Sequence, residues 1–173
     1  WGAEGVLYRL LKYSNSSYDY FVISLTSKGK YGDLIEGLGV KIFCLNMARG
    51  TINVSSIIKL YRLIKKNKPD VVQTWMHHAD LLGGLVAYFA GVKQIYWNLR
   101  TAELHSKKTK LLTRIVVLLC SMLSYIIPTK IVSCSSRAIQ VFKNAGYADK
   151  FILIPNGFDT NKFSWDEYER KKI

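Results

Sequence analysis

Three short groups of residues have side chains or backbone that could bind a ligand or move a proton. They are Gly2-Ala3-Glu4, His77-His78-Ala79-Asp80 and Asn98-Leu99-Arg100. A glycine that opens a helix leaves backbone N–H groups free to bind an anion. Histidine can bind a hydroxyl group or transfer its proton, and arginine can hold a phosphate or a carboxylate with two parallel hydrogen bonds. Each group is therefore a candidate binding element.

Each group also has a structural explanation. Gly2 could serve only as a turn residue. One of the two histidines could cap a helix while the other is solvated, and Asp80 could lie in a first helical turn, where the helix dipole favours a negative charge. Arg100 could pair with Glu103 on the surface. The sequence leaves these alternatives open.

Several other chemistries lack their sequence signatures. The sequence has no Gly-x-Ser-x-Gly elbow, no Walker A loop, no dinucleotide fingerprint and no spacing typical of metal ligands. Ser135 or Ser136 is better explained as a helix N-cap than as a nucleophile. Cys44, Cys120 and Cys134 lie in apolar runs, which indicates buried thiols in a reducing compartment. We therefore expect neither a metal nor another cofactor.

Apolar runs and helical patterns alternate along the chain. The patterns predict helices at 2–13, 31–38, 54–67, 79–90, 109–127 and 136–145, and strands at 20–25, 40–45, 70–75, 93–98, 130–134 and 151–154. This alternation predicts an α/β fold, a Rossmann-like doubly wound parallel sheet with helices on both faces. Ligands of such sheets bind beyond the carboxyl ends of the strands, where all three candidate groups are expected to fall.

The predicted order begins with a helix and lacks a first strand. In a doubly wound sheet of order 3-2-1-4-5-6, the first strand is central. Without it, the strands at 20–25 and 70–75 would each keep an unpaired edge in the middle of the sheet. We therefore expect the chain to be truncated at its N-terminus, as well as at its C-terminus.

The chain is basic, with 25 lysine and arginine residues against 12 acidic ones, a net charge of +13 over 173 residues. Such a charge suits nucleic acid, an anionic membrane surface or anionic small molecules, or else reflects a solvated lysine surface. Most aromatic residues fall in predicted strands and helices, so we expect no nucleic acid. One basic cluster ends the helix at 54–67 and consists of Lys59, Arg62, Lys65, Lys66 and Lys68.

A second basic stretch precedes a strongly apolar run. Its residues are Lys107, Lys108, Lys110 and Arg114, and the run covers residues 115–127. Because a bilayer span needs about 20 residues, this helix should be buried or lie on a surface. The basic stretch could dock on anionic lipid, and core packing is the alternative. Removal of the three lysines should weaken binding to anionic vesicles if that docking occurs.

The segment from Ile131 to Phe163 combines a strand, a helix, a strand and a turn. Its turn contains Pro155, Asn156 and Gly157, followed by Asp159. The segment resembles the end of the N-terminal domain of family 4 glycosyltransferases of the GT-B type, where Ser-x-Ser leads through a helix to Ile-Pro-Asn-Gly-Val-Asp-x-x-x-Phe. Phe158 replaces the usual small aliphatic residue. The turn is thus expected to mark a domain boundary.

Two further phrases resemble the same family. Trp1-Gly2-Ala3-Glu4 is similar to its Gly-Gly-Ala-Glu loop, with Trp1 at the first glycine. The stretch from Gln73 to Gly83 is similar to Val-x-x-His-x-x-x-Ala-Asn-Leu-Leu-Gly, with Asp80 at the asparagine position. Gly83-Gly84 is expected to permit close packing of a helix on the sheet. The resemblance extends from Gly2 to Phe163.

The resemblance implies a retaining transfer of sugar from a nucleotide-diphosphate sugar, generally without a metal, to a glycan or lipid-linked acceptor. Capsule, lipopolysaccharide or other cell-envelope polysaccharide would be the product, made in the cytoplasm, with peripheral attachment at the inner face of the membrane as an option. The loop of Gly2, Ala3 and Glu4 would face the donor diphosphate. Candidate contacts to the acceptor or the sugar are His77, His78, Asp80, Asn98 and Arg100. Many relatives carry a histidine near Asn98, so no catalytic residue is carried over.

The resemblance also implies a division into domains. Residues 1–163 would form the acceptor-side domain, and 164–173 would begin a linker to a donor-binding domain with paired glutamates. These residues alone should then be inactive. The alternative is a non-catalytic basic Rossmann-like module that binds an anionic glycan, lipid or nucleic acid. A second Rossmann-like domain encoded downstream would favour the transferase.

Overall fold

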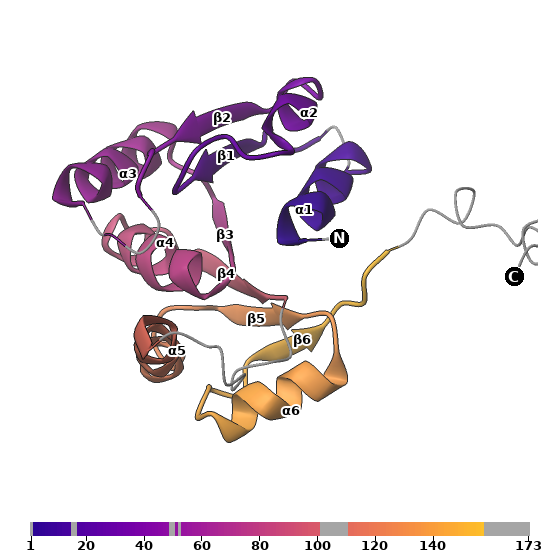
Figure 1. Ribbon diagram of the computed structural model, residues 1–173, viewed down its shortest axis with the longest axis vertical. Coiled ribbons are helices and arrows are strands. Elements are labelled where there is room, and N and C mark those ends of the chain that lie inside the picture. The colour runs from indigo at the N-terminus through magenta and orange to yellow at the C-terminus, as the bar shows by residue number, and fades with distance from the viewer. Residues whose placement is uncertain (1, 15–16, 49–50, 52, 101–110, 158–173) are drawn as a thin grey trace, which may run out of the picture.

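The computed structural model describes residues 2–14, 17–48, 51, 53–100 and 111–157. Helices and strands alternate in the predicted order (Figure 1). They are α1 (Ala3–Lys12), β1 (Phe21–Ser24), α2 (Gly32–Glu36), β2 (Lys41–Cys44), α3 (Val54–Asn67), β3 (Val71–Trp75), α4 (His77–Phe89), β4 (Gln94–Leu99), α5 (Leu111–Leu123), β5 (Lys130–Ser133), α6 (Ser136–Asn144) and β6 (Phe151–Leu153). This order confirms the α/β class.

Local capping signals explain where several helices begin and end. The side chain of Asn53 accepts a hydrogen bond from the backbone N–H of Ser55 at the start of α3. The same helix ends at Lys68, which has a φ of 44° and precedes Pro69. Ser135 caps α6 by accepting from the N–H of Ala138, which confirms one of the two predicted caps.

The strands form two parallel sheets. One has the order β1-β2 and the other the order β3-β4-β5-β6. Within the described residues, β1 and β3 do not pair with each other. The separation lies where the sequence predicts a central strand, and the presence of that strand in the complete protein stays a prediction.

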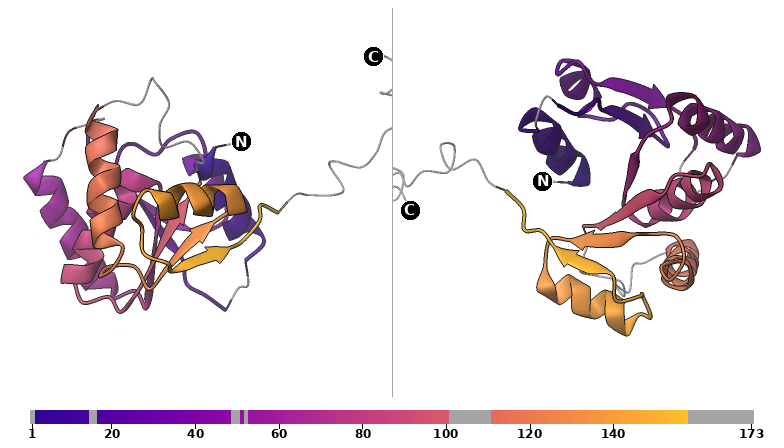
Figure 2. Two further views of the ribbon diagram at one scale, coloured as in Figure 1. Left: turned by 90° about the horizontal axis from the view of Figure 1, so that it is seen from below. Right: turned by 180° about the vertical axis from the view of Figure 1, so that it is seen from behind.

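Helices cover both sides of the strands. Figures 1 and 2 show α3, α4 and α5 side by side on one side, and α4 contacts both of its neighbours. Helix α2 packs on β2, and α6 packs on β5 and β6. The core lies between these layers, and its fully buried large side chains include Ile95, Trp97 and Leu99 of β4, Ile131 of β5 and Phe142 of α6.

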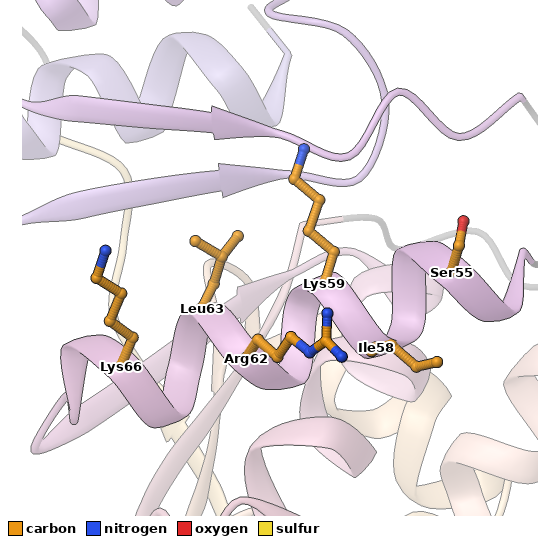
Figure 3. Close-up of a pocket in the computed structure, with 6 residues that line it drawn as sticks. All are labelled: Ser55, Ile58, Lys59, Arg62, Leu63 and Lys66. Carbon is orange, nitrogen blue, oxygen red and sulfur yellow. The ribbon is translucent and has the colours of Figure 1, made fainter.

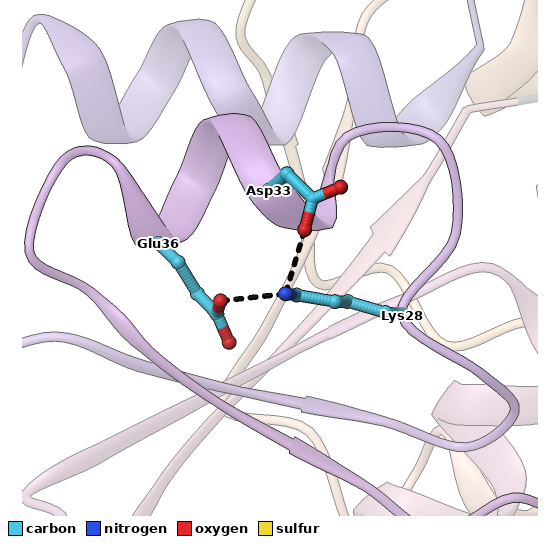
Figure 4. A network of polar contacts seen from close by, with 3 residues as sticks. All are labelled: Lys28, Asp33 and Glu36. Carbon is cyan, nitrogen blue, oxygen red and sulfur yellow. Dashed lines mark ion pairs between the residues drawn. The ribbon is translucent and has the colours of Figure 1, made fainter.

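A three-residue ion network orders the segment before α2 (Figure 4). The ammonium group of Lys28 lies 2.7 Å from a carboxylate oxygen of Asp33 and 2.6 Å from one of Glu36. Its hydrogen bonds to Asp33 and then Glu36 raise the pKa of Lys28 above its usual value. Because these groups are exposed, we assign the network a role in local order and not in overall stability.

Several helix boundaries differ from the prediction by one to four residues, and α2, for example, ends at Glu36 and not at 38. Helix α4 begins at His77 and not at 79, and the segment expected as helix to 127 ends as α-helix at Leu123. Residues after Leu123 turn instead, with the N–H groups of Ile126 and Ile127 bonded to the carbonyl of Leu123. In the described part of the chain, no helix is long and apolar enough to cross a membrane.

Gly84 allows α4 to pack closely on β4, as the sequence predicts. A Cβ atom on this buried glycine would lie 2.7 Å from Nε1 of Trp97 and 3.4 Å from Cγ2 of Ile127. Neither neighbour sits in open space, because Trp97 is fully buried and Ile127 is nearly so. A glycine is therefore required at position 84 because α4 lies so close to Trp97 of β4, and not because of its backbone conformation.

We expect Gly84→Ala to lower the free energy of unfolding by about 1–3 kcal/mol, the cost of forcing extra volume into a packed core. Gly37→Ala is the control, because its Cβ would meet atoms no closer than 3.4 Å at a φ of −60°. The control should be neutral or slightly stabilising. Urea denaturation measures both, and equal stabilities of the two variants would refute the close contact.

Candidate functional site

The candidate residues gather at one edge of the four-stranded sheet. Because β3, β4, β5 and β6 are parallel, their carboxyl ends meet at that edge. His77 follows β3, Arg100 follows β4 and Asn156 lies three residues after β6. The fold therefore brings together two groups that the sequence predicted as ligand contacts and a turn that it predicted as a boundary.

Arg100 is held in place by one residue of β3 and by one residue that follows β6. Its guanidinium carbon lies 5.0 Å from the centre of the Trp75 ring, at the end of β3. Its Nη1 donates a hydrogen bond to Oδ1 of Asn156. The side chain is half-buried, and its Nε has no hydrogen-bond partner within the described residues. Glu103, the alternative partner considered from the sequence, lies outside the described residues.

This arrangement fixes a positive charge at the edge where ligands of parallel sheets bind. Stacking on an aromatic ring and a side-chain amide contact restrict the guanidinium plane, so little rotamer freedom remains to be lost on binding. A guanidinium prepared in this way suits a phosphate or a carboxylate. The sequence did not predict the contributions of Trp75 and Asn156, because each lies far from Arg100 along the chain.

The junction between β3 and α4 has strained backbone at Met76. This residue has a φ of 73° and a ψ of 154°, which residues other than glycine rarely adopt. Its N–H donates to the carbonyl of Asn98 at 3.2 Å, and its carbonyl accepts from the N–H of Asp80 at 2.9 Å. Strain of this kind concentrates at functional sites, which supports the assignment of this edge.

The junction orients the two histidines differently. His77 is buried, its ring centre lies 5.5 Å from that of Phe142, and its Nδ1 has no hydrogen-bond partner in the described part of the chain. Burial, with a smaller contribution from the charge of His78, lowers the pKa of His77 to about 4. His77 is thus neutral at neutral pH. His78 is exposed and is the histidine that a ligand from solution can reach.

Asp80 and Asn98 lie beneath the edge. Asp80 is 0% exposed, and its Oδ1 accepts a hydrogen bond from the Thr74 hydroxyl at 2.6 Å. Burial raises the pKa of Asp80 well above its usual value, and the hydrogen bonds from Thr74 and the Asn98 backbone offset this only in part. Asn98 is also fully buried, and its Oδ1 has no partner among the described residues. Asp80 through its side chain and Asn98 through its backbone therefore support the edge from below.

Helix α1 packs on α2 and precedes β1 of the two-stranded sheet. The carbonyl of Gly2 accepts from the N–H groups of Gly5 and Val6, and no side chain caps the helix. A Cβ on Gly2 would meet no atom of the described residues within 4 Å, and Glu4 is exposed. The described part of the chain therefore leaves the backbone of Gly2 uncovered. Trp1 lies outside the described residues.

A separate shallow pocket lies on α3 (Figure 3). It is lined by Ser55, Ile58, Lys59, Arg62, Leu63 and Lys66. The ammonium group of Lys59 donates to the carbonyl of Cys44, the last residue of β2, at 2.9 Å. The pocket therefore belongs to the basic cluster that the sequence predicts and lies apart from Arg100. No group of acidic, histidine or cysteine side chains that could hold a metal occurs among the described residues.

The sequence of nearly the whole chain matches a known family. The model of Glycosyltransferase Family 4 matches residues 2–162 of the chain. The chain belongs to glycosyltransferase family 4. This membership confirms the resemblance seen at both ends of the sequence, from the loop at Gly2 to the turn at Asn156.

A curated relative and several solved structures are similar to this family member. The relative is the UDP-Gal:alpha-D-GlcNAc-diphosphoundecaprenol alpha-1,3-galactosyltransferase of Escherichia coli, 27% identical over 134 residues. Anabaena HepE (Alr3699) in complex with UDP-glucose has a TM-score of 0.74 at 18% identity, covering 99% of this chain. Its complex with UDP has a TM-score of 0.73 at 16% identity. These structures show the fold, a Rossmann-like GT-B half.

The chain spans only part of these proteins. The aligned region covers 76% of this chain but 34% of the E. coli enzyme, and this chain covers 44% of the HepE structure with UDP-glucose. The E. coli protein is named for a lipid-linked acceptor, and HepE was crystallised with a nucleotide sugar. Both are properties of those proteins and bear on this chain only as support for a proposal.

Proposed function

We propose that this family 4 glycosyltransferase chain is the acceptor-side part of a retaining enzyme. The complete enzyme transfers a sugar from a nucleotide-diphosphate sugar to a glycan or lipid-linked acceptor in the synthesis of cell-envelope polysaccharide. The observation that carries the proposal is the family match over residues 2–162. The lipid-linked acceptor in the name of the E. coli relative and the UDP-glucose bound to HepE support the choice of substrates.

The residues at the strand edge take separate roles in this proposal. The free N–H groups at the start of α1, next to Gly2, Ala3 and Glu4, face the donor diphosphate. Arg100 holds a phosphate of the donor or of the acceptor. His78 contacts an acceptor hydroxyl.

Three buried residues support that edge without contacting solvent. His77 is neutral and packs against α6, while Asp80 and Asn98 hold the β3–α4 junction together. We propose that these three residues position Met76 and His78 and that direct contact with the acceptor is left to the exposed groups.

The proposal divides the complete protein at the turn of Pro155, Asn156, Gly157 and Asp159. Residues 1–163 hold the acceptor, and residues from 164 lead to a second domain that holds the nucleotide. The enzyme works in the cytoplasm at the inner face of the membrane. Asp159 and the lysines 107, 108 and 110 lie outside the described residues, so their roles stay predictions from the sequence.

A donor screen on the full-length protein tests this function. We expect turnover of one nucleotide-diphosphate sugar, such as UDP-glucose or UDP-galactose, with a polyprenyl-diphosphate-linked sugar as acceptor. Proton NMR of the product should show the anomeric configuration of the donor, and a chelator should leave the rate unchanged. A product of inverted configuration would contradict the retaining reaction. Absence of both turnover and nucleotide binding across the panel would favour the non-catalytic module.

A further inference from the structure

The outward face of α5 is apolar. We call this face the apolar stripe; it comprises Leu111, Ile115, Leu118 and Met122 on α5 and Tyr125 and Ile126 in the turn that follows, all of them exposed. Residues three or four apart share one face of a helix, so these side chains form a continuous band. Leu118 and Met122 are 60% and 64% exposed. The inner face of the same helix buries Val116, Cys120 and Ser121.

A band of this length is unusual on a protein surface. Single exposed apolar side chains are ordinary, but contiguous exposed patches mark surfaces that bind a partner or a membrane. Core packing, one of the two explanations that the sequence left open for this apolar run, accounts for the inner face alone. The apolar stripe therefore needs a second explanation.

The helical layer that contains α5 is positively charged. Among α3, α4 and α5, the one acidic residue is Asp80, and it is fully buried. The exposed charges of the layer are Lys59, Arg62, Lys65 and Lys66 on α3 and Arg114 on α5. The three helices lie side by side (Figures 1 and 2), so apolar and basic side chains occupy one layer of the molecule.

We infer that the apolar stripe, together with the exposed basic residues of α3 and Arg114, docks this protein on an anionic lipid surface. Apolar side chains of a surface helix enter the boundary between headgroups and acyl chains, and nearby lysine and arginine residues are attracted to anionic headgroups. A second copy of the chain is a poorer occupant, because two such layers would bring like charges together. A nucleic acid would use the charges but would leave the stripe in water.

The docked orientation places the candidate site next to the lipid. Helix α5 is the connection after β4, so it begins at the edge where Arg100 lies. An acceptor anchored in the membrane would then reach that edge without leaving the bilayer. This orientation rests on the proposed lipid-linked acceptor, whereas the docking itself rests on the exposed stripe and the charge of its layer.

Sedimentation with vesicles tests the docking in the full-length protein. The test variant is Leu118→Glu with Met122→Glu, and the vesicles contain phosphatidylcholine with or without phosphatidylglycerol. We expect the variant to bind anionic vesicles at least about tenfold more weakly than the unmodified protein. Two apolar side chains that would enter the lipid are lost, and two negative charges that anionic headgroups repel are added. The matched control is Leu10→Glu with Leu34→Glu, whose residues are 49% and 51% exposed on α1 and α2. The control should bind as the unmodified protein does.

Three outcomes would overturn the inference. The first is equal vesicle binding by the test variant and the control. The second is a cysteine at position 118 that resists a water-soluble maleimide in the absence of vesicles, which would mean that another part of the protein covers the stripe. The third is a mass in solution that falls by half in the test variant, which would assign the stripe to a second copy. Labelling at position 118 that vesicles suppress would support the docking.

Vesicle binding is measured without a nucleotide sugar, so its failure is separate from a failure of the proposed function. If the docking and the proposed function are both correct, the test variant should transfer sugar to a short water-soluble acceptor at the normal rate but to a vesicle-bound acceptor at a reduced rate. Equal rates with the vesicle-bound acceptor would contradict a role of the stripe in presenting that acceptor.

Discussion

Arg100→Ala in the full-length protein is expected to reduce kcat/KM for sugar transfer by about 100-fold while the thermal midpoint changes by only a few degrees. The guanidinium is fixed by Trp75 and Asn156 at the ligand edge of the sheet, so its loss removes a prepared positive charge. The same side chain is only half-buried, and its loss opens no core cavity. Steady-state kinetics gives kcat/KM and calorimetry of the same preparation gives the thermal midpoint.

Two companion variants separate charge from geometry. Arg100→Lys keeps the charge but loses the planar group that stacks on Trp75, so it should restore only part of the rate. Lys143→Ala removes the α6 partner of a surface ion pair with Asp149 and serves as the control, with no expected change in rate. Losses of rate and stability that are equal in size for Arg100→Ala would assign this residue a structural role.

The stability of the domain should carry a pH dependence that belongs to His77. Its pKa is about 4 in the folded protein against 6.5 for an ordinary histidine, because burial disfavours the imidazolium. Between these two values the unfolded chain binds more protons than the folded one, so stability rises with pH. Full stability from this group is present above pH 6.5, and about 3 kcal/mol is lost as the pH falls to 4.

His77→Gln isolates this contribution. Asp80 has the opposite sign, because its raised pKa makes the folded state gain stability as the pH falls, so the total slope is a difference of two effects. Urea denaturation of both proteins from pH 7 to pH 4 should show the unmodified protein losing about 3 kcal/mol relative to the variant. Parallel curves for the two proteins would show that His77 titrates in the folded state as it does in the unfolded chain.

Several elements were predictable because their signals are local. Helix α3 has the predicted bounds, since Asn53 caps its start and Pro69 follows its end. The strands were predictable from short apolar runs bounded by turns, within one or two residues. The start of α4 was predicted two residues late, because the positive φ of Met76 is stabilised by its contact with Asn98 and not by any neighbour in sequence.

The candidate site was also predictable only in part. The sequence indicated His77, His78, Asp80, Asn98 and Arg100 from their positions at predicted strand ends. It gave equal weight to the two histidines, whereas packing against Phe142 of α6 buries one and leaves the other exposed. The partners of Arg100 lie 25 residues before it and 56 residues after it, so no window of sequence contains them.

By itself the sequence determined the order of strands and helices, the parallel sheet that this order requires and the family to which the chain belongs, because periodicity, caps and turn residues act over a few positions. The tertiary structure alone decided which polar groups are buried and which are exposed. That choice depends on side chains from distant segments: Trp75 and Asn156 fix Arg100, Phe142 covers His77, and no described segment covers the apolar stripe of α5. Burial then sets the pKa values and the surfaces from which the function is inferred.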